Sequence, residues 1–137
     1  MTISLRIVVP GQPVAKGRPR FSSRGGFVRS YTPGPTRAYE AEVAIYAREA
    51  MVAQNVATFV GPLNCTITVR LERPNKPKNK LHPITRPDLD NYVKAAMDGM
   101  QNGRVFADDS QIIHLVAHKE FAADPAQPEM VIYLVTA

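Results

Sequence analysis

The stretch RPDLDNYVKAAMDG, residues 86–99, gathers carboxylates in a chain that is otherwise basic. Its apolar residues recur at helical spacing, which predicts a helix over about residues 88–101. Asp88 stands at the expected N-cap, where a carboxylate accepts backbone N–H bonds, and Asp90 lies in the first turn. These two acids are therefore either helix caps or metal ligands, and the rest of the sequence has to decide. The expected buried stripe consists of Leu89, Val93, Ala96, Met97 and Met100.

The remaining elements follow from the same periodicities. Residues 36–54 have helical spacing, with Thr36 as the expected N-cap. Cys65 falls on the apolar side of an alternating stretch, so we expect a core residue rather than a catalytic thiol. The order β-α-β-α-β-β predicts an α+β fold with two helices on a small mixed, mainly antiparallel sheet. Strands are predicted at residues 2–9, 63–72, about 111–121 and 129–136.

Two long loops, residues 10–35 and 73–87, are rich in proline and basic residues and cannot form one regular element. In the first loop, Phe21 and Phe27 flank the sequence SSRGG, which is consistent with a short hairpin that has a basic tip. Loops of this length in a small domain are usually functional or disordered.

The size and composition of the chain narrow its class. A length of 137 residues is sufficient for a hydrophobic core, and we expect one domain over residues 1–137. No apolar run approaches the roughly 20 residues that cross a bilayer, and the N-terminus lacks the order of a signal peptide. The single cysteine excludes an internal disulfide, so a reducing, cytoplasmic setting is expected.

The net charge of +5 is unevenly distributed along the chain. Residues 1–39 contain seven Lys and Arg and no acid, and residues 70–86 contain six against one Glu. Residues 88–109 reverse the sign, with five Asp against two bases. Two basic flanks around an acidic centre suggest a polyanion that the flanks bind and the centre acts on. The alternative is that the basic residues merely keep the loops solvated.

A second acidic site, ADDSQI, follows the helix at residues 107–112. A strand that returns along the helix would bring Asp108 or Asp109 towards the first two acids. Three converging carboxylates repel one another unless a cation binds, and Mg²⁺ prefers such oxygen ligands. Such a site acts on phosphodiesters, and Lys94 would orient water or offset charge on the phosphorane. The alternative for Asp90 and Lys94 is a surface ion pair one helical turn apart.

Other catalytic chemistries lack a motif in this sequence. It contains neither a phosphate-binding P-loop nor the nucleophile elbow of hydrolases. His114 and His118 would lie about 13 Å apart along a strand, which is too far for one zinc ion.

The helical stretch and the acidic turn together resemble the signature of the RusA family of Holliday-junction resolvases, found in bacteria and their phages and prophages. RPDLDNYVKAAMDGM is followed by NGRVFADDSQI at the expected distance, and GQPVAKGRPRF and YTPGPTRAYE are similar to segments of many members. The resemblance implies a RusA-like, Mg²⁺-dependent endonuclease that resolves four-way DNA junctions as a homodimer. Paired symmetric cuts of this kind serve DNA recombination and repair.

The resemblance also assigns the site. It implies that Asp88, Asp90 and Asp109 are the essential acids that hold Mg²⁺, and that Lys94 is the essential lysine. It implies an α/β subunit whose dimer joins the sheets of two copies. This chain departs from the pattern at Pro87, where some relatives carry a second basic residue beside the one at position 86.

Phosphate contacts are expected from the bases of the two loops, and junction selectivity from dimer geometry and DNA shape. Two alternatives remain at this point. The protein could be a non-catalytic, basic DNA-binding module, or a Mg²⁺ nuclease for another branched or single-stranded nucleic acid. The expected DNA-binding residues are Lys16, Arg18, Arg20, Lys76, Lys78 and Arg86.

Overall fold

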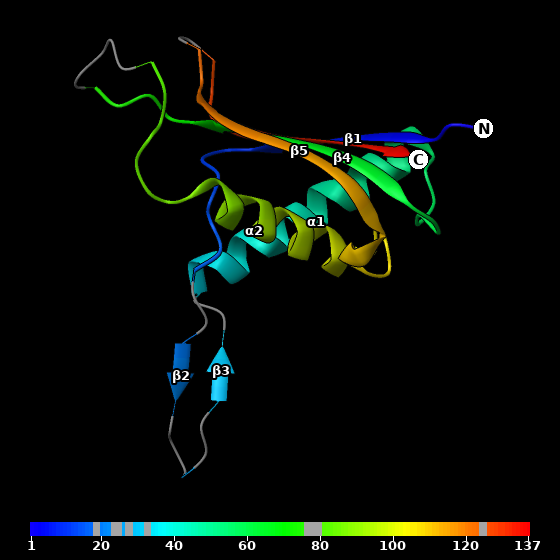
Figure 1. Ribbon diagram of the computed structural model, residues 1–137, viewed down its shortest axis with the longest axis horizontal. Helices are drawn as coiled ribbons and strands as arrows, with labels where there is room; N and C mark the ends of the chain where they lie inside the picture. The colour runs from blue at the N-terminus through cyan, green and yellow to red at the C-terminus, as the bar shows by residue number, and fades with distance from the viewer. Residues whose placement is uncertain (18–19, 23–25, 27–28, 32–33, 76–80, 124–125) are drawn as a thin grey trace.

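The computed structural model describes every residue except 18–19, 23–25, 27–28, 32–33, 76–80 and 124–125 (Figure 1). Its larger sheet has four strands in the order β1-β6-β4-β5. Only β4 and β5 are parallel neighbours, whereas β6 is antiparallel to both β1 and β4. The predicted α+β fold and its element order are confirmed, apart from an additional small hairpin. The four strands are β1 (Ser4–Pro10), β4 (Leu63–Leu71), β5 (Ile112–Phe121) and β6 (Glu129–Thr136).

Both helices, α1 (Gly34–Gln54) and α2 (Leu89–Asn102), lie on the same face of this sheet (Figure 1). Alternate residues of β1, β4 and β6 are buried, while most of their neighbours in sequence are at least partly exposed. Removing these apolar side chains from water drives the two layers together. Neither described helix has the length and hydrophobicity of a membrane span. The sheet contributes the fully buried side chains of Leu5, Ile7, Val9, Leu63, Ile67, Val69, Met130, Ile132 and Leu134.

Cys65 lies on the buried side of β4, as its alternation predicted, and is 1% exposed. Burial raises the pKa of its thiol to about 12, because a thiolate is disfavoured in apolar surroundings. The thiolate is the nucleophilic form of cysteine, so this side chain is a core residue and has no catalytic character at neutral pH.

The two helices approach each other closely at Gly99 of α2. A Cβ atom at this position would lie 2.5 Å from Cβ of Val43 and 3.0 Å from the carbonyl oxygen of Glu40, both in α1. Just after α2, a Cβ atom at Gly103 would lie 3.1 Å from the backbone of Ala44. Two residues without side chains therefore allow the helix backbones to pack at short range.

The N-cap predicted at Thr36 is wrong, because α1 begins earlier, at Gly34. Thr36 is 2% exposed and uses its hydroxyl elsewhere. The hydroxyl accepts the N–H of Gly17 at 3.0 Å and donates to the carbonyl oxygen of Ala15 at 3.3 Å. It thus holds the segment before the hairpin against α1 instead of starting the helix.

The hairpin consists of β2 (Arg20–Ser22) and β3 (Arg29–Tyr31), which pair antiparallel. It projects from the helical layer on the side away from the four-stranded sheet (Figure 1). This agrees with the hairpin suggested around SSRGG, although residues 23–25 and 27–28 of that hairpin lie outside the described residues.

Replacing Gly99 by alanine is expected to destabilise the protein by about 1–3 kcal/mol, because the new methyl group must displace Val43. Helix propensity alone would favour alanine by about 1 kcal/mol, so the sign of the change reports the packing. The free energy of unfolding in urea measures it. Gly61→Ala is the matched control, since a Cβ atom there meets nothing within 4 Å. A Gly99→Ala protein as stable as this control would contradict the close approach of the helices.

Candidate active site

Asp88 and Asp90 stand at the start of α2, and their carboxylates have no partner among the described residues. Asp88 occupies the N-cap position, with φ −72° and ψ 152°, but its side chain makes no capping hydrogen bond. Asp90 is exposed in the first turn, and neither carboxylate forms a hydrogen bond or ion pair with any residue that the structure describes. The capping role considered for Asp88 is therefore not supported. Two unpaired carboxylates so close in sequence favour a cation.

Lys119 of β5 fixes the loop that leads to Asp88. Its Nζ donates to the carbonyl oxygens of Thr85 and Pro87, both at 2.9 Å. Lys119 lies opposite Val69 in the parallel register of β5 and β4, and Val69 is buried on the helix-covered face of the sheet. We did not predict a role for Lys119, although a basic residue at an inward-facing position of a strand is a signal for one.

Lys94 lies one helical turn after Asp90 and contacts two other acids. Its Nζ lies 3.2 Å from Oδ1 of Asp98 and 3.3 Å from Oδ2 of Asp109. The hydrogen bond with Asp98 raises the pKa of Lys94, and partial burial opposes that shift only in part. Lys94 is therefore protonated at neutral pH. The ion pair with Asp90 that the sequence left open is not formed.

Asp108 and Asp109 have different parts in the turn after α2. Asp108 caps the 3₁₀ turn η2 (Asp109–Gln111), where its Oδ2 accepts the N–H of Ser110 at 3.3 Å. This bond with Ser110 lowers the pKa of the Asp108 carboxyl. The N–H of Asp109 donates to Oε1 of Gln101 in α2 at 3.1 Å, which holds the turn against the helix. Asp108 thus supports the turn, and Asp109 faces Lys94.

Gln111 connects this turn to the rest of the fold. Its Oε1 accepts the N–H groups of Ala107 at 3.0 Å and Asp108 at 3.3 Å. Its Nε2 donates to the carbonyl oxygens of Phe59 and Gly61, both at 3.1 Å. The glutamine of the acidic turn is therefore structural, since it joins that turn to the segment before β4.

The three acids expected to bind metal do not form a finished cluster. Asp109 contacts α2 by its ion pair with Lys94, whereas Asp88 and Asp90 lie about a turn away, at the start of the helix. Within the described part of the chain, no three His, Cys, Asp or Glu side chains are grouped so that they could hold a metal ion. Carboxylates repel one another, so without a cation they have no reason to converge. The donors themselves fit a hard divalent cation, because they are carboxylate oxygens and two of the groups are unpaired.

Lys16 lies between the two helices rather than on an open basic surface. Its Nζ is 2.8 Å from Oδ2 of Asp98 and 3.1 Å from Oε1 of Glu40, and its side chain is 20% exposed. Burial lowers the pKa of Lys16, but the hydrogen bonds with Asp98 and Glu40 more than offset this and the pKa is raised. A phosphate would have to compete with two carboxylates for this ammonium, so the geometry does not support the DNA contact predicted for Lys16.

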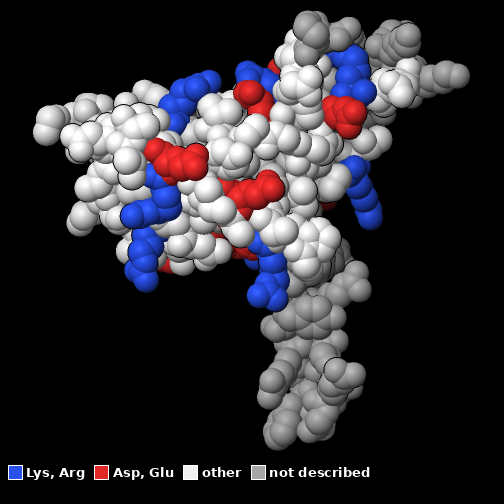
Figure 2. Space-filling model, turned by 180° about the vertical axis from the view of Figure 1, so that it is seen from behind, with Lys and Arg blue, Asp and Glu red and all other residues white. Residues whose placement is uncertain are grey.

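The structure describes only some of the other predicted DNA-binding residues. Arg18, Lys76 and Lys78 lie outside the described residues, and of Arg20 only the backbone is described, in β2. Arg86 is exposed just before the unpaired acids and forms no ion pair with a described residue. On the face seen in Figure 2, acidic and basic side chains are interspersed.

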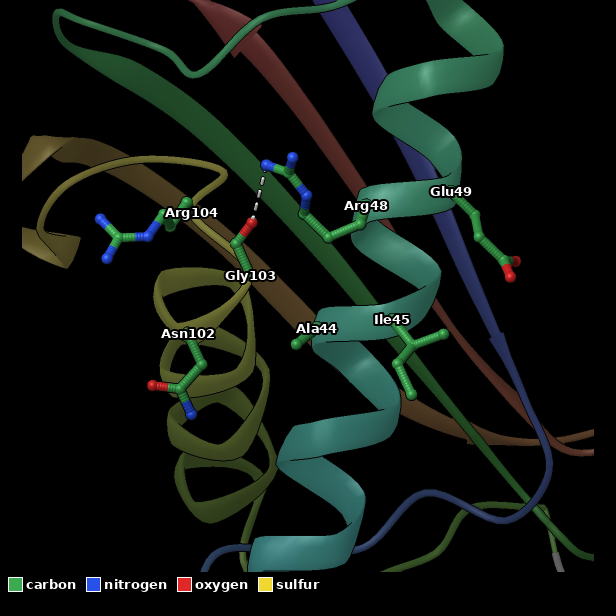
Figure 3. A pocket seen from close by; sticks show the side chains of 7 residues that line it. All are labelled: Ala44, Ile45, Arg48, Glu49, Asn102, Gly103 and Arg104. Atoms are coloured by element: carbon green, nitrogen blue, oxygen red, sulfur yellow. Dashed lines mark hydrogen bonds between the residues drawn. The ribbon is translucent and has the colours of Figure 1, made fainter.

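An open groove lies at the other end of α2 (Figure 3). Arg48 of α1 donates from Nη1 to the carbonyl oxygen of Gly103 at 3.3 Å, which ties α1 to the C-terminal end of α2. The groove offers a single carboxylate, so it lacks the paired acids that metal-assisted hydrolysis uses. It is lined by Ala44, Ile45, Arg48, Glu49, Asn102, Gly103 and Arg104.

The part of the chain that matches known proteins includes every residue of this candidate site. The family model of the endodeoxyribonuclease RusA matches residues 10–132 of the chain. An uncharacterized protein of Bacillus subtilis (strain 168), YqaN, is 33% identical in an alignment that spans 93% of this chain and 94% of YqaN. The matched region includes the start of α2, Lys94 and the acidic turn.

The uncapped state of Asp88 can be tested through stability. Asp88→Ala should change the free energy of unfolding by less than about 0.5 kcal/mol, whereas loss of a true cap costs about 1 kcal/mol. Asp108→Ala removes a side chain that does cap a turn, so it should lower the urea midpoint more than Asp88→Ala does. The reverse order would show that Asp88 is the structural cap.

Proposed function

The chain belongs to the RusA family of endodeoxyribonucleases, and from this membership we propose that it resolves four-way DNA junctions by paired, symmetric, Mg²⁺-dependent cuts. The observation that carries the proposal is the pair of unpaired carboxylates, Asp88 and Asp90, on the same helix as a lysine that holds a third acid. Residues 1–137 would act as one catalytic domain in a bacterial cytoplasm, in DNA recombination and repair.

We assign the Mg²⁺ ligands to Asp88, Asp90 and Asp109. A bound Mg²⁺ supplies Lewis-acid chemistry, in that it polarises a phosphate oxygen and lowers the pKa of a coordinated water. Lys119 supports this assignment because it fixes the loop from which Asp88 emerges. Gln101 supports it at the other end of the site by holding the N–H of Asp109.

Lys94 would provide a positive charge beside the reacting phosphate. Its hydrogen bond with Asp98 raises its pKa, so it is suited to stabilise negative charge in the transition state and unsuited to accept a proton. The same ammonium lies 3.3 Å from Oδ2 of Asp109, one of the assigned ligands.

Phosphate contacts are assigned to Arg18, Arg20, Lys76, Lys78 and Arg86. Arg20 belongs to the hairpin that projects from the helical layer (Figure 1), and Arg86 lies two positions before Asp88. Such contacts release counterions, so affinity should fall steeply as salt rises. They position DNA without reading its bases, which leaves selectivity to the shape of the junction.

We also propose that a second copy of the chain joins the sheet at β5. At the β1 edge, the Gln54 amide partly closes the backbone, because it bonds the N–H and carbonyl of one residue, Arg6, at 3.0 and 2.7 Å. No described side chain closes the β5 edge in this way, and β5 exposes Ile113, Leu115 and Val116. An uncovered apolar edge strand favours pairing with another strand. A two-fold dimer suits a substrate with approximate two-fold symmetry.

The proposed activity is tested with a labelled synthetic four-way junction beside a matched linear duplex. The wild type should make paired cuts only in the junction and only with Mg²⁺. Asp90→Asn should still bind the junction but cut it at least about 100-fold more slowly, because a metal ligand is lost. Glu49→Gln, the same change in an exposed acid of α1, is the matched control and should cut at the wild-type rate.

Two results would contradict this proposal. If junction and duplex are bound alike and neither is cut with any divalent metal, the protein is a DNA-binding module. If a flap, a single strand or an RNA is cut faster than the junction, the four-way junction is not the preferred substrate.

The dimer is tested by sedimentation. Val116→Asp places a charge on the exposed edge strand and is expected to convert dimers to monomers, because an unpaired charge is costly to bury. Val60→Asp is the matched control, since Val60 is 90% exposed outside the sheet. A Val116→Asp protein that remains dimeric would exclude this edge as the interface.

A further inference from the structure

Asp98 joins two lysines in the middle of α2. Its Oδ2 lies 2.8 Å from Nζ of Lys16, and its Oδ1 lies 3.2 Å from Nζ of Lys94. Lys16 is also 3.1 Å from Oε1 of Glu40, and Lys94 is 3.3 Å from Oδ2 of Asp109. These five side chains form a row of alternating charge that runs from α1 to the acidic turn, and we call it the charge row.

Exposure rises along the charge row from Glu40 to Lys94 and is 29% at Asp109, in the acidic turn. The side chain of Glu40 is 8% exposed, that of Lys16 20%, that of Asp98 22% and that of Lys94 53%. A charge removed from water depends on its partner, so the Glu40–Lys16 pair is the fixed end. Lys94 carries its charge on a long flexible stem, so its position depends on what its ammonium contacts.

The backbone around Lys16 is fixed as well. The N–H of Lys16 donates to the carbonyl oxygen of Asn91, in the first turn of α2, at 2.8 Å. The N–H of Gly17 donates to Oγ1 of Thr36 in α1 at 3.0 Å. The segment that leads into the β2–β3 hairpin is thus bound to both helices immediately before the hairpin begins.

Lys94 has a competing partner in Asp90. The two residues are four positions apart in α2, the spacing at which helical ion pairs form. A Lys94–Asp90 pair would occupy a carboxylate that the proposed function assigns to Mg²⁺. Asp98 lies four positions on the other side of Lys94 and holds the ammonium at 3.2 Å instead.

We infer that Asp98 and Lys16 are positioning residues that hold Lys94 against the acidic turn and away from Asp90. The inference rests on the proposed function, because that proposal gives Lys94 and Asp90 their roles. Lys16 acts through Asp98 and not through DNA, although it lies at the foot of the hairpin assigned to DNA binding. The charge row therefore connects the base of this hairpin to the lysine of the site.

Asp98→Asn removes the shared charge and keeps the size of the side chain. In cleavage of a junction with enzyme in excess, the rate constant should fall about 10- to 100-fold, because a small misplacement of a catalytic group has an effect of that order. The Mg²⁺ concentration that gives half the maximal rate should rise, and junction affinity without metal should stay the same. Asp98→Glu should restore part of the rate.

Glu129→Gln is the matched control for this experiment. It breaks an ion pair of 2.8 Å with Arg70, and its side chain has a similar exposure, 27%, but it lies in β6, outside the charge row. This variant should cut at the wild-type rate. An Asp98→Asn protein that cuts as fast as Glu129→Gln would overturn the inference.

A second readout needs neither DNA nor metal. In ¹⁵N-labelled protein, Asp98→Asn should shift the ammonium signals of Lys16 and Lys94, and Glu129→Gln should shift neither. An unchanged Lys94 signal in Asp98→Asn would overturn the inference, whatever the enzyme cuts. If the signals shift but the wild type cuts no nucleic acid, the positioning of Lys94 is supported and the proposed function is rejected.

A double variant separates the role of Lys16 from DNA binding. Lys16→Met is combined with Glu40→Gln so that no buried carboxylate is left unpaired. If Lys16 acts through Asp98, the double variant should cut the junction more slowly at saturating enzyme. Its affinity for the junction, and the salt dependence of that affinity, should be unchanged. The opposite result would show that Lys16 contacts phosphate, and would overturn its part in the inference. In that case the double variant binds DNA more weakly, the slope of log affinity against log salt is smaller by about one, and the cleavage rate at saturating enzyme is unchanged.

Discussion

The close packing of α1 on α2 at Gly99 places charges from four segments within reach of one another. A Cβ atom at this position would meet Val43 and the backbone of Glu40, so the close approach of the two helices requires glycine here. This approach puts the Glu40 carboxylate and the Asp98 carboxylate on either side of one ammonium, that of Lys16. The N-terminal segment, both helices and the acidic turn are linked electrostatically because the hydrophobic layer beneath them is tightly packed.

Repulsion between carboxylates explains the state of the candidate site. Asp88 and Asp90 are exposed and have no partner in the described part of the chain, and Asp109 contacts Lys94. Exposed carboxylates stay ionised in water, whereas bringing three of them together would require a compensating cation. On the proposed function, that cation is Mg²⁺, and the protein contributes rigid supports at both ends of the site. Lys119 fixes the loop before the first acid, and Gln111 joins the acidic turn to the segment before β4.

The two edges of the sheet are treated differently, and this difference bears on assembly. The amide of Gln54 occupies the backbone N–H and carbonyl of Arg6 in β1, whereas β5 exposes apolar side chains at the other edge of the sheet. The hairpin and both helices lie on the same side of the sheet (Figure 1), and Lys119 of β5 bonds the loop before Asp88. On the proposed function, β5 would serve assembly through its exposed edge and the site through Lys119.

The sequence by itself determined the layers of this protein, because strand and helix periodicities are local. The alternation of β4 predicted its buried side, and the bounds of β4 and α2 were predicted to within a residue. Of the stripe predicted for α2, Val93, Ala96 and Met100 are buried, whereas Leu89 and Met97 are partly buried. The buried Tyr92 and Ala95 were not predicted. Local pattern failed for Thr36, whose hydroxyl bonds a segment far from α1 in sequence. Only the tertiary structure decided the partners of Lys16 and Lys119, which lie 24 and 34 residues away at Glu40 and Thr85. A charged side chain carries no periodic signal, and its partner is set by how distant elements pack.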